Sequence, residues 1–320
     1  MKKYLLTASA LVMSFAPQLS AAQDWPNRPV KLVVPFVSGT TGVIARMVAD
    51  ELQATYKQPF VLEQKPGASG IIATEFVAKA SPDGYTLLLS TNTAHSVNPH
   101  LFKKLPYDPI KDFTPIARFC FVPFVLAVRG DSPFKSVSDL LAYGKANPGK
   151  LSYGYANSTG QISGASFNTQ TKLGALAVSY KTAPQVLTDL IGGEIAFTFS
   201  DVGSSAALTQ AGRLRAIAVT SEEKSALMPE LPTIATAANL PGYVVSAWVG
   251  FVGPAGLPPE VTQKVSSVLL KMLQRKDVID KLAAVSAEPA PMGNREMGPY
   301  MVRQLDVWGQ KVRDAGIEPQ

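Results

Sequence analysis

The sequence predicts an α/β protein with two lobes, each built on a mostly parallel β-sheet flanked by helices. Apolar strand-like runs alternate along the chain with segments of helical periodicity, and this β-loop-α rhythm is typical of parallel sheets covered by helices. A chain of 320 residues is too long for one small core, and its 46% hydrophobic content is ordinary for a globular protein.

The first 22 residues have the pattern of an export signal. Lys2 and Lys3 precede a mostly apolar stretch from Tyr4 to Phe15, which is shorter than the roughly 20 apolar residues of a membrane-spanning helix. The small residues Ser20 to Ala22 then fit a cleavage site. We therefore expect a signal peptide over residues 1–22, cleaved near Ala22. Its removal leaves 298 residues and lowers the formal net charge from +6 to +4.

A first series of elements predicts lobe one. Strands are expected at Val30–Pro35, Phe60–Glu63 and Tyr85–Leu89, with helices from Val43 and at Ile71–Ala80 between them. The helix from Val43 rests on apolar residues that recur at helical spacing. Pro66–Gly70 and Pro82–Gly84 have the composition of turns.

A second series, from about residue 125, predicts lobe two. Its strands are expected at Val125–Val128, Leu151–Tyr155, Ala177–Tyr180, Ile195–Phe199 and Leu214–Thr220. Ser136 and Asp139 form a capping-box pattern before a helix that ends near Asn147, and an apolar helix begins at Ile162. Thr182 is the expected cap of a third helix, which Gly192 and Gly193 end.

The last part of the chain predicts a return to lobe one. Val244–Val252 reads as a long buried strand, and helical stretches follow at 259–274, 276–284 and 294–315. Helices added after the second series suggest that they complete the first lobe. The predicted domains are therefore 23–124 with 246–320 as lobe one and 125–245 as lobe two, joined by a double hinge near 121–125 and 244–248.

The sequence lacks the motifs of common enzymes. With only His95, His100 and Cys120, no zinc-binding spacing is available, and no Gly-x-Ser-x-Gly, Walker or Gly-x-Gly-x-x-Gly motif is present. We therefore predict a protein that is not an enzyme and has no metal or cofactor. Cys120 lies in an apolar run and is expected to be a small buried hydrophobe. No basic cluster with interleaved aromatic residues suggests nucleic-acid binding.

The loops that precede helices are rich in short polar residues. They are Ser38–Gly42, Ala68–Gly70, Thr91–Thr93, Asn157–Gly160 and Asp201–Ser205. In open α/β sheets, ligands bind beyond the carboxyl ends of the strands, and a helix N-terminus there favours an anion. Each loop is equally suited to an ordinary cap or turn, and Asp201 fits a helix N-cap as well as a ligand contact. Their recurrence in both predicted lobes favours a carboxylate site.

Many ordered segments of the sequence resemble one family. They are Trp25–Phe36, Ile44–Arg46, Pro66–Gly70, Ser81–Leu88, Asn98–Pro99, Lys104–Asp108, Asp112–Pro115, Asn147–Leu151, Leu187–Gly193, Ala211–Ala216, Leu231–Thr233 and Gly253–Gly256. Over nearly its whole mature length, the chain resembles the periplasmic receptors of tripartite tricarboxylate transporters, also called Bug receptors. The resemblance implies a monomeric, type II-like periplasmic binding protein that closes on a small organic carboxylate and docks on the integral-membrane permease subunits of the transporter.

The resemblance also implies a binding site. Carried over residue by residue, it consists of Phe36, Ser38, Gly39, Thr40, Thr41, Thr91, Asn92, Thr93, Asn157, Ser158, Thr159, Gly160 and Asp201; Ser69 and Thr182, from a polar loop and a helix cap, complete the prediction. The backbone amides of Ser158, Thr159 and Gly160 are expected to hold one carboxylate. The alternative function is a periplasmic ligand sensor that acts on a signalling partner.

One departure from the family bears on the ligand. The first loop is one residue shorter than the family's, with Gly42 where an Asp is common. The missing anion favours plain carboxylates over amino acids, and the shorter loop leaves room for a bulkier dicarboxylate, aliphatic or aromatic. The candidate aromatic wall consists of Phe36, Phe121, Phe124 and Trp248, of which at least two are expected to pack in the core instead.

Overall fold

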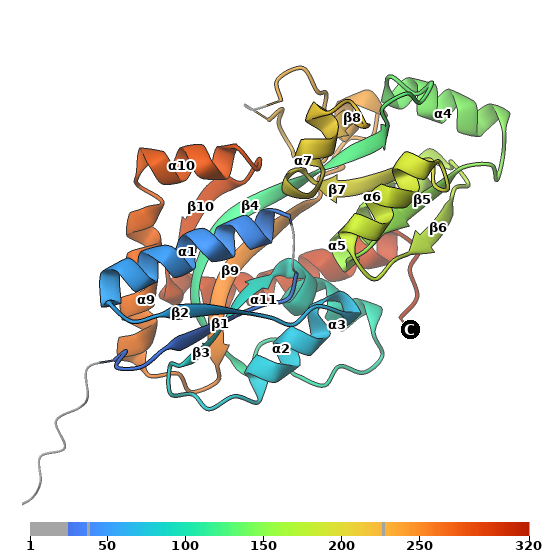
Figure 1. Cartoon of the computed structure of the whole chain (residues 1–320). Coiled ribbons are helices and arrows are strands. Elements are labelled where there is room, and N and C mark those ends of the chain that lie inside the picture. Colours follow the sequence, from blue (N-terminus) through green and yellow to red (C-terminus); the bar gives the residue numbers. More distant parts are fainter. Residues whose placement is uncertain (1–24, 37–38, 226–227, 320) are drawn as a thin grey trace, which may run out of the picture.

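Two lobes lie side by side and are joined by strands that run through both (Figure 1). The computed structural model describes residues 25–36, 39–225 and 228–319. The predicted signal peptide and Ser38 lie outside the described residues. Within the described part of the chain, no helix is long and apolar enough to cross a membrane.

Lobe one is built on a mixed sheet in the strand order β2-β1-β3-β9-β4. The strands are β1 (Val30–Val34), β2 (Phe60–Gln64), β3 (Thr86–Thr91), β9 (Ser246–Pro254) and the first part of β4 (Phe113–Arg129), with β10 (Glu288–Met292) paired to β4. The helical segments are α1 (Thr40–Tyr56), η1 (Ala68–Gly70), α2 (Ile71–Ala78), η2 (Thr93–Val97), α3 (Asn98–Leu101), α9 (Pro259–Met272), α10 (Lys276–Ala283) and α11 (Asn294–Asp314).

Lobe two uses the second part of β4 as its first strand. To this it adds β5 (Ser152–Tyr155), β6 (Leu176–Ser179), β7 (Phe197–Asp201) and β8 (Leu214–Val219). Its helices are α4 (Val137–Ala146), α5 (Ser158–Thr171), α6 (Ala183–Gly192), α7 (Val202–Gln210) and α8 (Ile234–Ala237). α11 begins on lobe one, but its end reaches lobe two, where the Thr169 hydroxyl donates to the Ala315 carbonyl at 3.2 Å.

The strands that cross between the lobes make the sheets mixed rather than mostly parallel. The β-loop-α units pair in parallel as predicted, β1 with β2 and β3, and β5 with β6 and β7. The long strands β4 and β9 run antiparallel to their neighbours. A chain that passes to the other lobe and returns must reverse its direction, and the sequence pattern of the local units does not show this.

Thr220 joins the two crossing segments. β4 pairs with β9 up to Pro123 and with β7 from Phe124 onward. The Thr220 hydroxyl accepts from the Phe124 amide at 2.8 Å and donates to the Val245 carbonyl at 2.6 Å. The exchange of partners near residues 124 and 245 supports two crossings at these places, while the exact domain boundaries stay a prediction.

Local signals placed most elements correctly. Ser136 and Asp139 form the predicted capping box of α4, and Gly193 ends α6 in a left-handed conformation. Two helices begin earlier than predicted, α1 at Thr40 and α5 at Ser158. Several candidate binding residues therefore lie in the first turns of helices rather than in the preceding loops.

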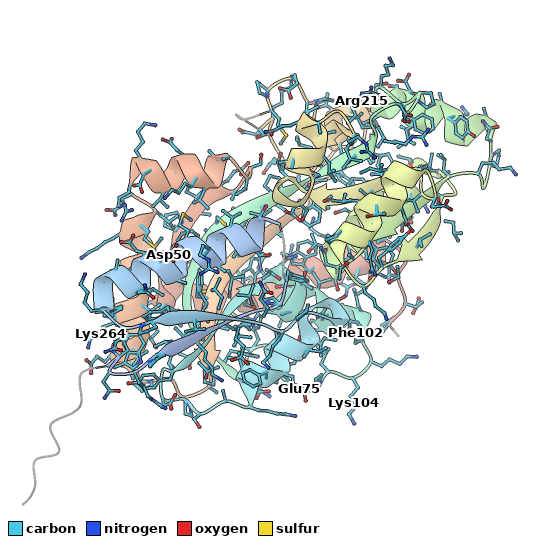
Figure 2. All side chains as sticks on the ribbon, in the orientation of Figure 1. Asp50, Glu75, Phe102, Lys104, Arg215 and Lys264 are labelled. Atoms are coloured by element: carbon cyan, nitrogen blue, oxygen red, sulfur yellow. The ribbon has the colours of Figure 1, made fainter. Side chains whose placement is uncertain are left out.

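A continuous buried apolar cluster extends through both lobes, from Leu32 in β1 to Phe197 in β7. Cys120 lies in this cluster, and burial raises the pKa of its thiol far above the ordinary value, which confirms the buried hydrophobe predicted from its apolar run. The labelled basic side chains lie far from one another, Lys104 in the loop between α3 and β4, Arg215 on β8 and Lys264 on α9 (Figure 2).

Candidate functional site

A cavity with about 790 Å³ of empty space, its mouth included, lies between the lobes. It lies beyond the carboxyl ends of β1, β3, β5, β6 and β7, where Pro35, Asn92, Asn157, Lys181 and Asp201 contribute to its wall. The position is the one that open α/β sheets use for ligands.

The candidate residues after β3 form a buried polar wall. Thr91, Asn92 and Thr93 line the cavity, and each is at most 5% exposed. Asn92 Nδ2 lies 3.0 Å from Thr159 Oγ1, and Thr93 Oγ1 lies 3.2 Å from the same atom. Because Thr159 belongs to lobe two, these contacts join the lobes at the inner end of the cavity.

Two polar atoms of this wall have no partner among the described residues. They are Thr91 Oγ1 and Asn92 Oδ1. The Thr159 hydroxyl is able to donate as well as to accept, so either orientation of the Asn92 amide is possible, and each leaves one amide atom unpartnered. Buried polar groups are nearly always hydrogen-bonded. The wall therefore offers hydrogen-bonding groups to a ligand, and the orientation that exposes the NH₂ suits a carboxylate.

The N-terminus of α5 forms the facing wall of lobe two. Ser158 and Thr159 are its first residues, and N–H groups at this position lack intrahelical acceptors. Gly160 differs, because its N–H donates to Asn157 Oδ1 at 2.8 Å. Asn157 thus caps the Gly160 amide, and the expectation that all three amides hold a carboxylate stays a prediction. The side chain of Ser158 is also engaged, donating to Asn98 Oδ1 at 2.7 Å.

Asp201 connects the lobes instead of presenting a free carboxylate. Its Oδ1 accepts from Thr40 N at 3.0 Å, Thr40 Oγ1 at 2.9 Å and Ser204 N at 3.0 Å, and its Oδ2 accepts from Ser204 Oγ at 2.7 Å. One carboxylate thus caps α7 in its own lobe and α1 in the other. The N-cap interpretation is confirmed, and although Asp201 lines the cavity, these four donors occupy its oxygens.

The remaining predicted residues are divided by the structure. Most of the predicted residues line the cavity: Phe36, Thr40, Thr41, Ser69, Thr91, Asn92, Thr93, Asn157, Thr159, Thr182 and Asp201. Three of them, Gly39, Ser158 and Gly160, do not line it. Gly39 instead permits the close approach of the lobes: with its φ of 81°, a β-carbon there would collide with Ser204. Thr182 occupies the N-cap position of α6 without a side-chain capping bond.

The floor of the cavity is apolar and comes from the crossing strands. Val122 and Phe124 of β4 and Ala247 and Val249 of β9 line it. Only Phe124 among these residues was predicted, because a buried crossing strand carries no local signal that one of its faces borders a cavity.

The candidate aromatic wall is half correct. Phe36 and Phe124 line the cavity. Trp248 is fully buried and packs edge-on against Tyr300, and Phe121 packs under the guanidinium of Arg118, 4.6 Å from its ring centre. The last two residues serve packing, as expected for at least two of the four.

Lys181, which was not predicted, lines the cavity from the turn between β6 and α6. Its only local signal is its place just before a helix cap, in a turn of the kind that supplies the other polar residues of the site.

The histidines offer no catalytic or metal-binding arrangement. His95 is fully buried outside the cavity lining, its Nδ1 lies 2.7 Å from the Pro109 carbonyl, and burial lowers its pKa to about 4. His100 Nε2 lies 2.9 Å from the Leu305 carbonyl. Among the described residues, no cluster of His, Cys, Asp and Glu is able to hold a metal ion.

The sequence of residues 44–317 matches the tripartite tricarboxylate transporter family receptor, TctC. The chain belongs to this family. Receptors of the family bind solutes and are not enzymes, which confirms the predicted solute-binding role and the prediction that the protein is not an enzyme.

Solved structures similar to the chain extend this assignment. The Rhodopseudomonas palustris protein Rpa4515 with adipate is 36% identical, with a TM-score of 0.90 over 93% of this chain and 100% of that one. The periplasmic binding protein BugD is 30% identical, with a TM-score of 0.86 over 92% of this chain and 100% of the other. MatC from R. palustris, with bound malate, is 28% identical, with a TM-score of 0.81 over 90% and 100%. The predicted binding-protein fold is therefore confirmed.

Proposed function

We propose that the protein is a periplasmic receptor that captures a small dicarboxylate between its lobes and delivers it to a tripartite tricarboxylate-type membrane transporter. The observation that carries this proposal is the cavity itself. It combines buried hydrogen-bonding groups at its inner end with an apolar floor between the lobes. The N-terminal pattern of residues 1–22 supports export and cleavage near Ala22.

The inner end of the cavity is suited to a carboxylate. Thr91 and Asn92 of lobe one and Thr159, in the first turn of α5 in lobe two, line this end. The dipole of α5 adds a partial positive charge at this point. We assign this end to one carboxylate of the ligand, held by neutral donors that bind it without a buried ion pair.

The floor of the cavity favours an apolar spacer behind that carboxylate. Val122, Phe124 and Val249 present no polar side-chain atom, and each is at most 4% exposed. A hydroxyl placed against them would lose its hydrogen bonds to water without replacement. Adipate, which Rpa4515 holds, has an unsubstituted spacer, whereas the malate held by MatC carries a hydroxyl. We therefore propose a dicarboxylate with an unsubstituted aliphatic or aromatic spacer.

Closure of the lobes is the proposed mechanism. Direct hydrogen bonds join them in this structure, at Asp201 with Thr40 and at Thr159 with Asn92. A ligand that contacts both lobes binds this arrangement more tightly than an open one and therefore stabilises it. Rotation about the crossing segments at 121–125 and 244–248 provides the hinge, with 23–124 and 246–320 moving against 125–245. A closed monomer then presents both lobes to the permease.

A thermal-shift screen tests the ligand class. The mature protein is unfolded, dialysed and refolded to remove bound solute, then mixed with mono-, di- and tricarboxylates, with amino acids and sugars as controls. A dicarboxylate at about 100 times its Kd stabilises the folded state by about 2.7 kcal/mol, a shift of several degrees. A response only to amino acids or sugars contradicts the proposal. Transport is tested separately, because deletion of the protein should abolish uptake of the ligand found.

A further inference from the structure

We infer that Lys181 selects dicarboxylates over monocarboxylates by pairing with the second carboxylate of the ligand at the mouth of the cavity. The inference rests on the proposed function and deepens it, because it assigns the other end of the ligand.

Lys181 is the only cationic side chain among the described residues that line the cavity. The one anionic side chain there is Asp201, and four donors from Thr40 and Ser204 already occupy its oxygens. Among the described lining residues, Lys181 therefore presents the one positive charge to a ligand, while neutral donors engage the Asp201 carboxylate. Among the described residues, Lys181 has no ion pair or hydrogen bond, while Lys31, Lys79 and Lys276 are paired with carboxylates.

The exposure of the lining residues distinguishes a buried inner end of the cavity from a solvent-exposed rim. Its inner end, at Asn92 and Thr159, is at most 1% exposed, whereas Lys181 and Pro66 at its rim are exposed. A carboxylate held at the inner end directs the rest of the ligand along the apolar floor toward the rim. The second carboxylate of a dicarboxylate then approaches Lys181, and a monocarboxylate of the same length brings only a methyl group there.

The chemistry of lysine suits this role. Its ammonium is a compact charge on a flexible stem with three donors, so it adapts to spacers of different length. At the rim the ammonium keeps much of its hydration, which avoids the large penalty of a buried unpaired charge. Hydrogen bonds to charged groups are the stronger ones, and their lower range corresponds to about tenfold in affinity. We expect a gain of this size for a dicarboxylate and none for a monocarboxylate.

The test compares adipate with hexanoate, which has the same number of carbons and one carboxylate. Calorimetric titration of the refolded, ligand-free protein at low salt measures both Kd values. Lys181→Met removes the charge and keeps most of the stem; it should weaken adipate binding about tenfold and leave hexanoate binding unchanged. Lys181→Arg should retain adipate binding within about threefold, because the charge is kept.

Lys150→Met is the matched control. Lys150 is an exposed lysine of lobe two, just before the N-terminal end of β5 and thus at the opposite end of that strand from the cavity. It does not line the cavity, and its substitution should leave both Kd values unchanged. A melting curve for each variant verifies that it is folded.

In the wild type, added NaCl should weaken adipate binding more steeply than it does in Lys181→Met, because an ion pair is screened.

The outcomes separate this inference from the proposed function. A wild-type protein that binds no carboxylate overturns both. Adipate binding that is the same in the wild type and in Lys181→Met, or an equal loss for adipate and hexanoate, overturns the inference and leaves the receptor function standing.

Discussion

Asp201→Asn tests whether the contact between the lobes contributes to ligand capture. In the structure, Asp201 Oδ1 accepts from Thr40 N at 3.0 Å and from Thr40 Oγ1 at 2.9 Å across the cleft. Asparagine is also a good N-cap, so α7 should remain formed. The substitution removes the negative charge, which changes two charge-assisted interlobe bonds into neutral ones. It therefore acts mainly on the closed form.

The size of the effect follows from those two bonds. Hydrogen bonds to charged groups contribute about 1.5–3 kcal/mol and neutral ones about 1 kcal/mol, so the loss of charge from two bonds should cost the closed form about 1–4 kcal/mol. This corresponds to about 5- to 900-fold in the closing equilibrium. When the free protein is mainly open, the apparent Kd rises by the same factor, because the ligand must shift a less favourable equilibrium.

Calorimetric titration with adipate, or with the ligand that the screen identifies, measures this change. The matched control is Asp139→Asn, which alters a capping carboxylate of the same lobe that contacts Lys135 and Ser136 far from the cleft. We expect Asp139→Asn to leave the Kd unchanged. An unchanged Kd in Asp201→Asn, or an equal rise in both variants, would refute the reasoning.

Three further predictions concern closure, pH and the thiol. Gly203→Ala places a β-carbon 2.6 Å from Thr40 N in the other lobe. Ligand affinity measured by titration should fall by about tenfold because the added carbon overpacks the closed form, while the melting temperature of the free protein should hold or rise because alanine favours α7. A lower melting temperature with unchanged ligand affinity would contradict this. The pKa of His95 is lowered from 6.5 to about 4 in the folded protein. Between these two pH values, only the unfolded state takes up a proton on this imidazole. The free energy of unfolding therefore falls by about 1.4 kcal/mol per pH unit as the pH decreases from 6.5 toward 4. Urea unfolding at pH 5, 6 and 7 should show a shallower loss for His95→Gln than for His100→Gln, which keeps His95; equal slopes would be evidence against a buried neutral His95. Cys120, whose thiol pKa is raised by burial, should react with a disulfide reagent at pH 8 only after unfolding in guanidinium, and labelling of the native protein would show that the site is open.

Elements with strong local signals were predictable from the sequence. The capping box of α4 lies within four residues, and the cap and glycine stop of α6 lie next to the helix they bound. β10 (Glu288–Met292) was missed because Pro289 and Pro291 argue against a strand. Both prolines are tolerated because β10 pairs with β4 alone and is therefore an edge strand. The full length of β4 was missed because its first half is buried and irregular, without alternation.

The site was predictable in its loops and not in its contacts across the cleft. Polar composition and the resemblance to the family identified Thr91, Asn92 and Thr159, which line the cavity. The bond between Asp201 and Thr40 joins residues 161 positions apart, and no local pattern encodes such a pair. Lys181 was missed for a related reason, since a single lysine before a helix is usually solvated and only the folded chain places it at the cavity.

The most direct test of the account is the distance between the lobes with and without ligand. Asp50→Cys on α1, a position labelled in Figure 2, and Gln210→Cys at the end of α7 place one exposed label on each lobe, while the native Cys120 is buried. Pulsed electron paramagnetic resonance then gives the distribution of label distances. We predict that saturating dicarboxylate converts a broad distribution into a single shorter distance. An unchanged distribution under conditions where calorimetry shows full binding would contradict capture by closure.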